Sequence, residues 1–201
     1  EWAVNSDGTW SNAAFWTGGV PNAVGATANF GTIITSSRTV TVDAPQTLGA
    51  MNFDSAFAYQ ITGSSTLTFD VATGQAAISV LSGGHNIAAP ITLNKDLTIT
   101  TAASSGVAMS GVLTASGKTI TKAGAGTVQF ENVRAEGLNV NEGFAQISSK
   151  GSSNSAAGTS IVGSLNIATG AQLDLTNNAL VIDYTSAGTI VTDLQQHLAS
   201  G

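Results

Sequence analysis

Few side chains in this sequence are suited to acid–base or nucleophilic chemistry. It holds two histidines, His85 and His197, and no cysteine. A catalytic serine or threonine needs a base that a third group orients, and the stretch 82–87 around His85 lacks the elbow motif of a nucleophilic serine. We interpret His85 as part of a surface turn that leads into a strand, and His197 as a surface residue of a helix. No His-x-x-x-His spacing for zinc is present.

Carboxylates are the other candidate catalytic groups, and they are dispersed along the chain. Glycoside hydrolysis needs two carboxylates facing one cleft, yet no Asp-Asp or Asp-x-Asp cluster occurs among Asp54, Asp70, Asp96, Glu131, Asp174 and Asp183. If Asp174 and Asp183 stack in adjacent turns, they and Asn177 and Asn178 would offer oxygen ligands to Ca²⁺. The alternative that we favour is that these residues form Asx turns at corners. We therefore predict no catalytic residue, no cofactor and no metal site.

Aromatic residues gather near the N-terminus. Trp2, Trp10 and Trp16 all lie in residues 1–47, and Tyr59 follows. Large rings gain stability when they are removed from water, so the favoured interpretation is a hydrophobic cap packed on the next element. The alternative is a stacking platform for sugars, in which these four rings would present their faces to an extracellular glycan.

Composition and charge exclude several classes of protein. Only 9% of the 201 residues are charged, 42% are hydrophobic, and the formal net charge is -6. Nucleic acids and anionic membranes call for a basic stripe, and the six basic residues are scattered: Arg38, Lys95, Lys118, Lys122, Arg134 and Lys150. No apolar run approaches the ~20 residues that span a bilayer, so we predict no membrane insertion. The absence of cysteine suits an extracellular bacterial protein, and we expect the native chain to be longer than these 201 residues.

Short runs of alternating apolar and polar residues dominate residues 48–188, with Gly, Ser, Asn or Asp between them. Such runs predict very short strands with one buried face. They are Met51–Phe53, Tyr59–Ile61, Leu67–Phe69, Ile78–Val80, Ile91–Leu93, Leu97–Ile99, Val128–Phe130, Leu138–Val140, Leu165–Ile167, Leu173–Leu175 and Leu180–Ile182. An earlier run, Thr39–Val42, has the same period.

Two all-β architectures are compatible with these runs. An antiparallel sandwich uses longer strands and tight Asn-Gly or Asp-Gly hairpins, and the only such dipeptide is Asp7-Gly8. A parallel β-helix stacks coils of roughly 20 or more residues, each built from short strands and roomier turns. We favour the parallel β-helix (β-solenoid), with residues 48–188 as its body.

The two ends of the chain are expected to differ from this body. Residues 1–47 form an aromatic-rich capping segment in this interpretation. Residues 189–201 break the alternation, because Ile190, Val191, Leu194 and Leu198 recur at helical spacing after a potential N-cap at Thr189. We predict a short C-terminal α-helix there, which either covers the last coil or joins a neighbouring molecule.

Two glycine- or serine-rich stretches are interpreted as connections. Gly124-Ala125-Gly126 precedes a strand rather than a helix, so it is a turn and not a phosphate-binding loop. Residues 148–158 are dominated by serine, alanine and glycine and predict an exposed, mobile loop.

Residues 120–147 carry a family resemblance. The segment Ile120-Thr121-Lys122-Ala123-Gly124-Ala125-Gly126-Thr127-Val128-Gln129-Phe130, with the strand that follows, resembles the autotransporter-associated β-strand repeat, which reads Leu-Thr-Lys-x-Gly-x-Gly-Thr-Leu-x-Leu. The usual Tyr-x-Gly-x-Thr before the second strand is replaced here by residues 133–137. The resemblance implies a right-handed parallel β-helix at a bacterial surface, acting as a stalk, passenger or adhesive scaffold. It transfers no catalytic residue, because the motif glycines, threonines and leucines are structural.

These observations favour a non-catalytic structural module of a secreted bacterial surface, fibre or extracellular-matrix protein, either adhesive or self-assembling. Self-association is expected end to end or side by side, because unpaired strand edges tend to join. An extracellular glycan-binding module is the alternative, and a polysaccharide-active β-helix enzyme is the less favoured third interpretation.

Overall fold

The alternating runs form strands of an all-β fold. A computed structural model describes residues 1–184, and each of the short runs predicted above overlaps one of its strands. Inward side chains alternate with outward ones along each strand, because successive residues of a strand point to opposite faces. In β5, for example, Met51 and Phe53 are fully buried and Asn52 between them is half-buried.

The strands lie in three rows, which we call the first, second and third row. The first row contains β1 (Gly8–Thr9), β3 (Arg38–Thr41), β6 (Tyr59–Thr62), β9 (Gly84–Ile87), β12 (Gly106–Met109), β14 (Thr127–Phe130), β16 (Phe144–Ile147) and β18 (Gln172–Asp174). The second row contains β2 (Thr27–Phe30), β5 (Ala50–Asp54), β8 (Ala76–Ser82), β11 (Leu97–Thr101), β13 (Leu113–Ala123), β15 (Arg134–Val140), β17 (Ser160–Ile167) and β19 (Leu180–Ile182). The third row contains β4 (Gln46–Leu48), β7 (Leu67–Phe69), β10 (Ile91–Leu93) and the beginning of β13.

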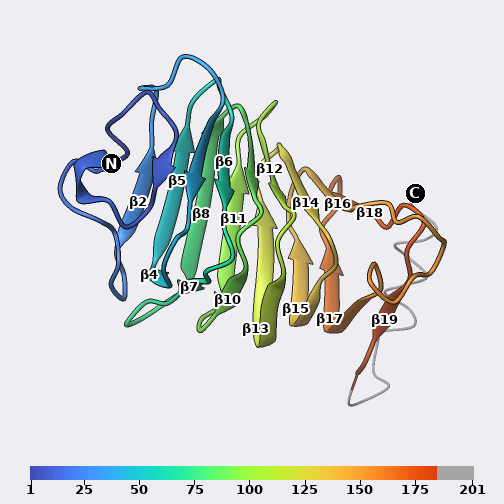
Figure 1. Cartoon of the computed structure of the whole chain (residues 1–201). Helices are drawn as coiled ribbons and strands as arrows, with labels where there is room; N and C mark the ends of the chain where they lie inside the picture. The colour runs from blue at the N-terminus through green and yellow to red at the C-terminus, as the bar shows by residue number, and fades with distance from the viewer. Residues whose placement is uncertain (185–201) are drawn as a thin grey trace.

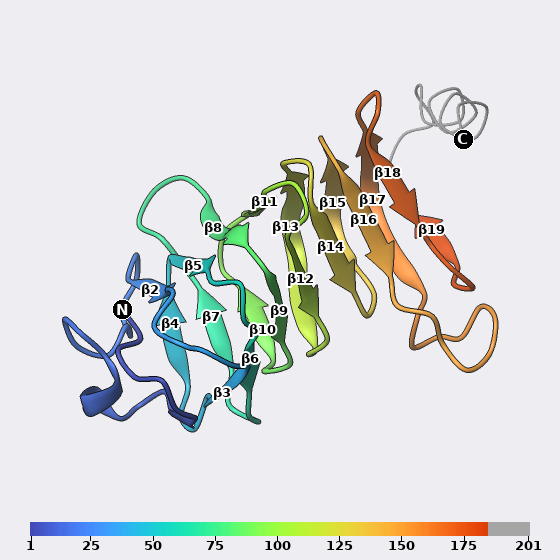
Figure 2. The same ribbon diagram turned by 90° about the horizontal axis from the view of Figure 1, so that it is seen from above.

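From β2 to β13 successive strands lie in the second, first and third rows in turn, and each strand pairs with the strand that precedes it in the same row. In the described residues every pairing between these strands is parallel; one isolated antiparallel bridge joins Trp2 and Trp16. The antiparallel sandwich is therefore wrong. Figures 1 and 2 show the strands side by side in one elongated stack from the N-terminal end to β19.

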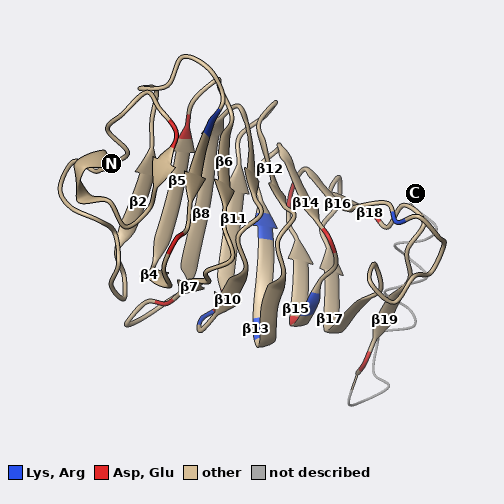
Figure 3. Ribbon diagram, in the orientation of Figure 1, with Lys and Arg blue, Asp and Glu red and all other residues tan. Residues whose placement is uncertain are grey.

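The core runs along the inside of the three rows. It is almost entirely apolar, from Trp10 and Phe30 at the N-terminal end through Ile61 and Ile99 to Val162. Charged side chains are sparse and spread over the described part of the stack (Figure 3). The strands thus enclose an apolar column within a largely uncharged surface.

Residues 1–26 include β1 and contact β2, β3 and β4 at the N-terminal end of the rows. Trp2 N donates to Asn29 O of β2 at 2.9 Å, Thr39 N of β3 donates to Asp7 Oδ1 at 2.8 Å, and Thr47 N of β4 donates to Asn22 Oδ1 at 2.9 Å. A single 3₁₀ turn, η1 (Ala13–Phe15), begins at the N-cap Asn12. The helix predicted for residues 189–201 lies outside the described residues.

Candidate functional site

The described surface carries a groove of about 510 Å³ beside the third row, which we call the edge groove. One wall is the backbone from the end of β12 into β13. The other is made by the corner after β14 and by the loop 148–158. Its lining residues are Ser110, Gly111, Val112, Leu113, Thr114, Ala115, Ser116, Glu131, Asn132, Arg134, Lys150 and Ala157.

The groove arises from a difference in chain length between two successive turns of the chain. Met109 pairs with Phe130, and Thr119 pairs with Gly137. Met109 and Thr119 are ten residues apart in one turn, whereas their partners Phe130 and Gly137 in the next turn are seven residues apart. The shorter turn has no strand beside Leu113 and Thr114, and β15 pairs with β13 only from Ala115 onward. Two of the three extra residues lie in the register shift between Ala115 and Thr119, and one lies before Ala115, beside the hollow.

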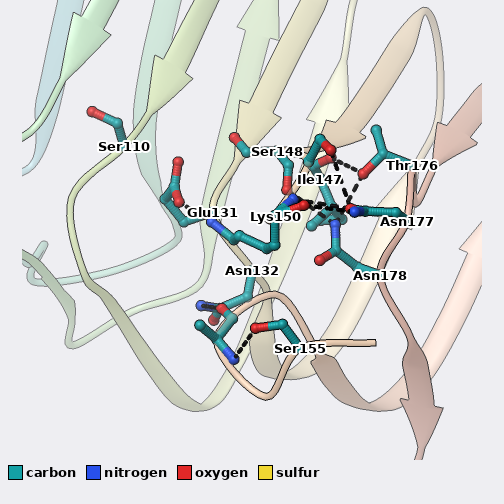
Figure 4. Close-up of polar contacts among 12 residues, drawn as sticks. Ser110, Glu131, Asn132, Ile147, Ser148, Lys150, Ser155, Thr176, Asn177 and Asn178 are labelled. Carbon is teal, nitrogen blue, oxygen red and sulfur yellow. Dashed lines mark hydrogen bonds and ion pairs between the residues drawn. The ribbon is translucent and has the colours of Figure 1, made fainter. Parts of the chain in front are cut away.

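Polar contacts hold the loop 148–158 against the far wall. Lys150 Nζ forms an ion pair with Glu131, whose side chain is 36% exposed against 17% for that of Lys150. Asn132 Nδ2 donates to Ala157 O at 3.0 Å, and Arg134 Nη2 donates to Ala156 O at 2.7 Å. The loop is exposed, as predicted, and Figure 4 shows Glu131 and Lys150 close together beside it. Both cations of this wall are engaged within the protein.

The base of the same loop is fixed by Asn177 and Asn178. Asn177 Oδ1 accepts from Lys150 N at 2.9 Å, and Asn177 Nδ2 donates to Lys150 O. Asn178 Nδ2 donates to Ser148 O, Leu175 O and the hydroxyl of Thr176. Figure 4 shows these contacts gathered around Lys150, Asn177 and Thr176. Both asparagines therefore connect two neighbouring corners of the chain by hydrogen bonds.

The carboxylate oxygens of Asp174, which were considered for Ca²⁺, have other partners. Asp174 Oδ1 accepts from Thr176 N at 2.7 Å, which is an Asx turn, and Oδ2 accepts from Gln146 Nε2 at 2.9 Å. The Gln146 and Thr176 hydrogen bonds lower the pKa of Asp174. In residues 1–184 no three acidic or histidine side chains gather as a metal-binding group. The Asx-turn interpretation is confirmed for Asp174.

His85 lies in the interior, so its interpretation as a surface residue is wrong. Its side chain is 3% exposed and stacks on Phe53, with ring centroids 4.5 Å apart. Nδ1 accepts from Tyr59 N at 3.1 Å, and Nε2 lies 2.8 Å from Ser82 O. These contacts fit a neutral ring with its proton on Nε2. Burial lowers the pKa of His85, and the hydrogen bonds of its ring in the described residues go to backbone atoms. His197 lies outside the described residues.

The aromatic rings near the N-terminus pack on one another. Trp2, Trp10, Trp16 and Tyr59 are between 0% and 5% exposed. Trp10 and Trp16 have ring centroids 5.0 Å apart, and Trp16 Nε1 donates to Trp10 O at 2.7 Å. Burial, with a smaller contribution from the Glu1 carboxylate, raises the pKa of Tyr59, whose hydroxyl donates to Gly31 O. Hydrophobic packing is confirmed, and these four rings offer no exposed face to a sugar.

Lys122 is a buried cation that the sequence reasoning treated only as part of a repeat motif. Its side chain is 0% exposed, and Nζ donates to Ala123 O at 2.9 Å, to Glu142 O at 3.0 Å and to Gly124 O. Burial lowers the pKa of Lys122, and the Glu142 carboxylate partly opposes that shift. The sequence did indicate this burial, because Lys122 lies two residues after Ile120 in β13 and therefore points to the same, inward face.

Gly124 begins the turn that follows Lys122. Its φ is +74°, and a Cβ there would lie 2.4 Å from Thr101 O, so only glycine fits without strain. Residues 124–126 form a bend between β13 and β14, which confirms the turn. A strand follows it, and the helix that a phosphate loop requires is absent at this place.

Comparison of the chain with family models, with curated proteins and with solved structures finds no match. The resemblance of residues 120–147 to the autotransporter-associated repeat therefore stays a prediction. Within residues 1–184 no helix has the length and apolar character needed to cross a bilayer.

Proposed function

We propose that this chain is a rigid, non-catalytic segment of a secreted bacterial surface, fibre or matrix protein, folded as a right-handed parallel β-helix. The observation that carries the proposal is the continuous parallel pairing of the second row, from β2 to β19, around an apolar column. Hydrogen bonds to neighbours on both sides restrain each inner strand, and such a stack resists bending. Stiffness is the property that a stalk or scaffold needs.

The distribution of polar groups also supports a structural role. The buried titratable residues His85 and Lys122 hold backbone groups and lie in different turns of the chain. The edge groove carries the carboxylate of Glu131, which is already paired with Lys150. A glycosidase site would need two carboxylates facing one cleft, and the groove lining contributes one.

At the N-terminal end, the proposed role of residues 1–26 is capping. They occupy hydrogen-bonding groups of β2, β3 and β4 that a stacked second molecule would need. Self-association through this end is therefore disfavoured, and lateral contacts or contacts at the opposite end are the proposed routes of assembly.

The test combines shape with chemistry. Small-angle scattering of the purified chain is expected to give an elongated rod, and incubation with a panel of extracellular polysaccharides is expected to release no new reducing ends or unsaturated sugars. Cleavage that disappears on substitution of one acidic residue, Glu131→Gln for example, would overturn the non-catalytic assignment. A spherical scattering envelope would overturn the β-helix itself.

A further inference from the structure

A side chain replaces a backbone acceptor in the first row, at the corner where β6 begins to pair with β9. Arg38 and Tyr59 are register partners in β3 and β6, and Arg38 N donates to the backbone carbonyl of Ala58 at 2.9 Å. Tyr59 N, at the equivalent place in the next pairing, donates instead to Nδ1 of His85 at 3.1 Å. The imidazole ring therefore takes the place of a strand carbonyl at this corner.

The pairing of β6 with β9 is short. Gln60 with Asn86 and Ile61 with Ile87 are its two pairs in register. The pairings on either side of it, of β3 with β6 and of β9 with β12, have four pairs each. Because fewer ladder hydrogen bonds join these two strands, the contact of Tyr59 with His85 is a larger part of what holds them. We call this pairing, with its corner residues 55–59 and 82–86, the β6–β9 joint.

The His85 ring accepts on one nitrogen and donates from the other. Nε2 lies 2.8 Å from Ser82 O, which can only accept, so Nε2 carries the proton and Nδ1 is the acceptor. A second proton on Nδ1 turns that acceptor into a donor, which then faces the donor N–H of Tyr59. The hydrogen bond is lost, and a charge lies on a side chain that is 3% exposed. Both changes favour separation of the corner, because separation lets water reach the ring.

Few charged groups surround this ring. On the strands packed around it, the titratable or charged side chains are Asp54 of β5, Tyr59 of β6 and Arg38 of β3, and β8 and β12 carry none. Asp54 Oδ1 accepts from the hydroxyl of Ser82 at 2.8 Å, and Arg38 donates to Asn5 Oδ1. Burial lowers the pKa of His85. An open corner, in which the ring is hydrated, therefore binds a proton more readily than the closed corner.

We propose that the β6–β9 joint is an acid-sensitive switch: protonation of His85 separates residues 55–59 from residues 82–86 while the rest of the stack stays folded. The other rows hold the same two turns of the chain together, because β5 stays paired with β8 and β7 stays paired with β10. Opening loosens one row and uncovers the buried ring of Phe53, on which His85 stacks. This proposal goes beyond the structural role and does not depend on it.

The experiment is amide hydrogen exchange of the ¹⁵N-labelled 201-residue chain, followed by NMR from about pH 7.5 to about pH 4.5 and corrected for intrinsic exchange. We expect the protection of the Tyr59 amide to fall by up to about tenfold per pH unit below about 6.5. The amides of β11 and β13 should keep their protection, since these strands lie outside the joint. The ring ¹⁵N resonances of His85 give an independent readout, and their midpoint should match that of the exchange.

His85→Gln is the matched variant, because its amide oxygen can accept from Tyr59 N and does not titrate. We expect it to keep the protection of Tyr59 at acidic pH. Asp54→Asn removes the carboxylate at the end of β5 and is expected to retain the acid-induced loss. The proposal is overturned by an equal loss in His85→Gln, by disappearance of the loss in Asp54→Asn, or by a simultaneous loss in β11 and β13. Unchanged protection of Tyr59 down to about pH 4.5, or a midpoint that differs from that of the His85 ring, overturns it as well.

Discussion

Replacement of Lys122 by methionine tests whether the buried ammonium stabilises the fold. Lys122 Nζ donates to three backbone carbonyls, those of Ala123, Gly124 and Glu142, from a side chain that is 0% exposed. A hydrogen bond to a charged group contributes about 1.5–3 kcal/mol. Methionine fills a similar volume, and it also removes the desolvation cost that lowers the pKa of Lys122. We expect a net loss of about 2–4 kcal/mol of unfolding free energy.

The assay is urea unfolding of the native chain and of Lys122→Met at pH 7, followed by circular dichroism. Lys118→Met is the matched control, because Lys118 lies in the same strand, is partly exposed and is not one of the donors to these carbonyls. We expect that control to change stability by less than about 0.5 kcal/mol. Equal or greater stability of Lys122→Met would show that the cation is a net burden and would refute the reasoning.

The pH dependence of the unfolding free energy of the native chain and of Lys122→Met gives a second measurement. Because the pKa of Lys122 is lowered in the folded chain, the unfolded chain binds more protons between that lowered value and about 10.5. Because of Lys122, the free energy of unfolding of the native chain therefore increases as the pH rises through that window. Lys122→Met is expected to lack this gain, so the difference in stability between the two proteins should change only between the lowered pKa of Lys122 and about 10.5.

Three further predictions concern other buried contacts. Burial lowers the pKa of His85, so its contribution to stability is complete above pH of about 6.5 and declines as the pH falls toward the folded value; thermal melts of His85→Gln should lack this decline. Trp10→Ala removes a fully buried ring and should cost about 3–5 kcal/mol in urea unfolding. Gly158→Ala would place a Cβ 1.7 Å from Asn178 Oδ1; we expect a loss of about 1–3 kcal/mol, partly rescued by the second substitution Asn178→Ala in a double-mutant cycle.

Periodicity predicted the strands because it is a local property. Every short alternating run that was predicted between Met51 and Ile182 overlaps a strand. In a strand the first and third side chains of such a run point to the same face, so both apolar side chains can be buried together. The choice of parallel pairing rested on the scarcity of tight hairpin signals, and the parallel register confirms it. The same local rule correctly placed the turn at residues 124–126, where positive φ at Gly124 is required.

The edge groove was not predicted, because it depends on a comparison between two turns of the chain. Nothing local to Leu113 or Glu131 indicates that the next turn is three residues shorter. That difference becomes visible only when Met109 is paired with Phe130 and Thr119 with Gly137. The burial of His85 was not predicted, because a histidine was expected at the surface from its residue type. Ile87, two residues later in β9, points inward, and residues two apart in a strand share a face.

The buried polar residues within residues 1–184 occupy the same kind of position in different turns of the chain. Each lies near the end of a strand, where the chain turns and backbone groups lose their sheet partners. His85 meets Ser82 O and Tyr59 N, Lys122 meets three carbonyls, and Ser105 Oγ donates to Val80 O and Ala102 O. Because an unpaired buried carbonyl is costly, inward polar side chains at corners stabilise the stack. Their distribution therefore follows the corners of the fold along the described part of the stack.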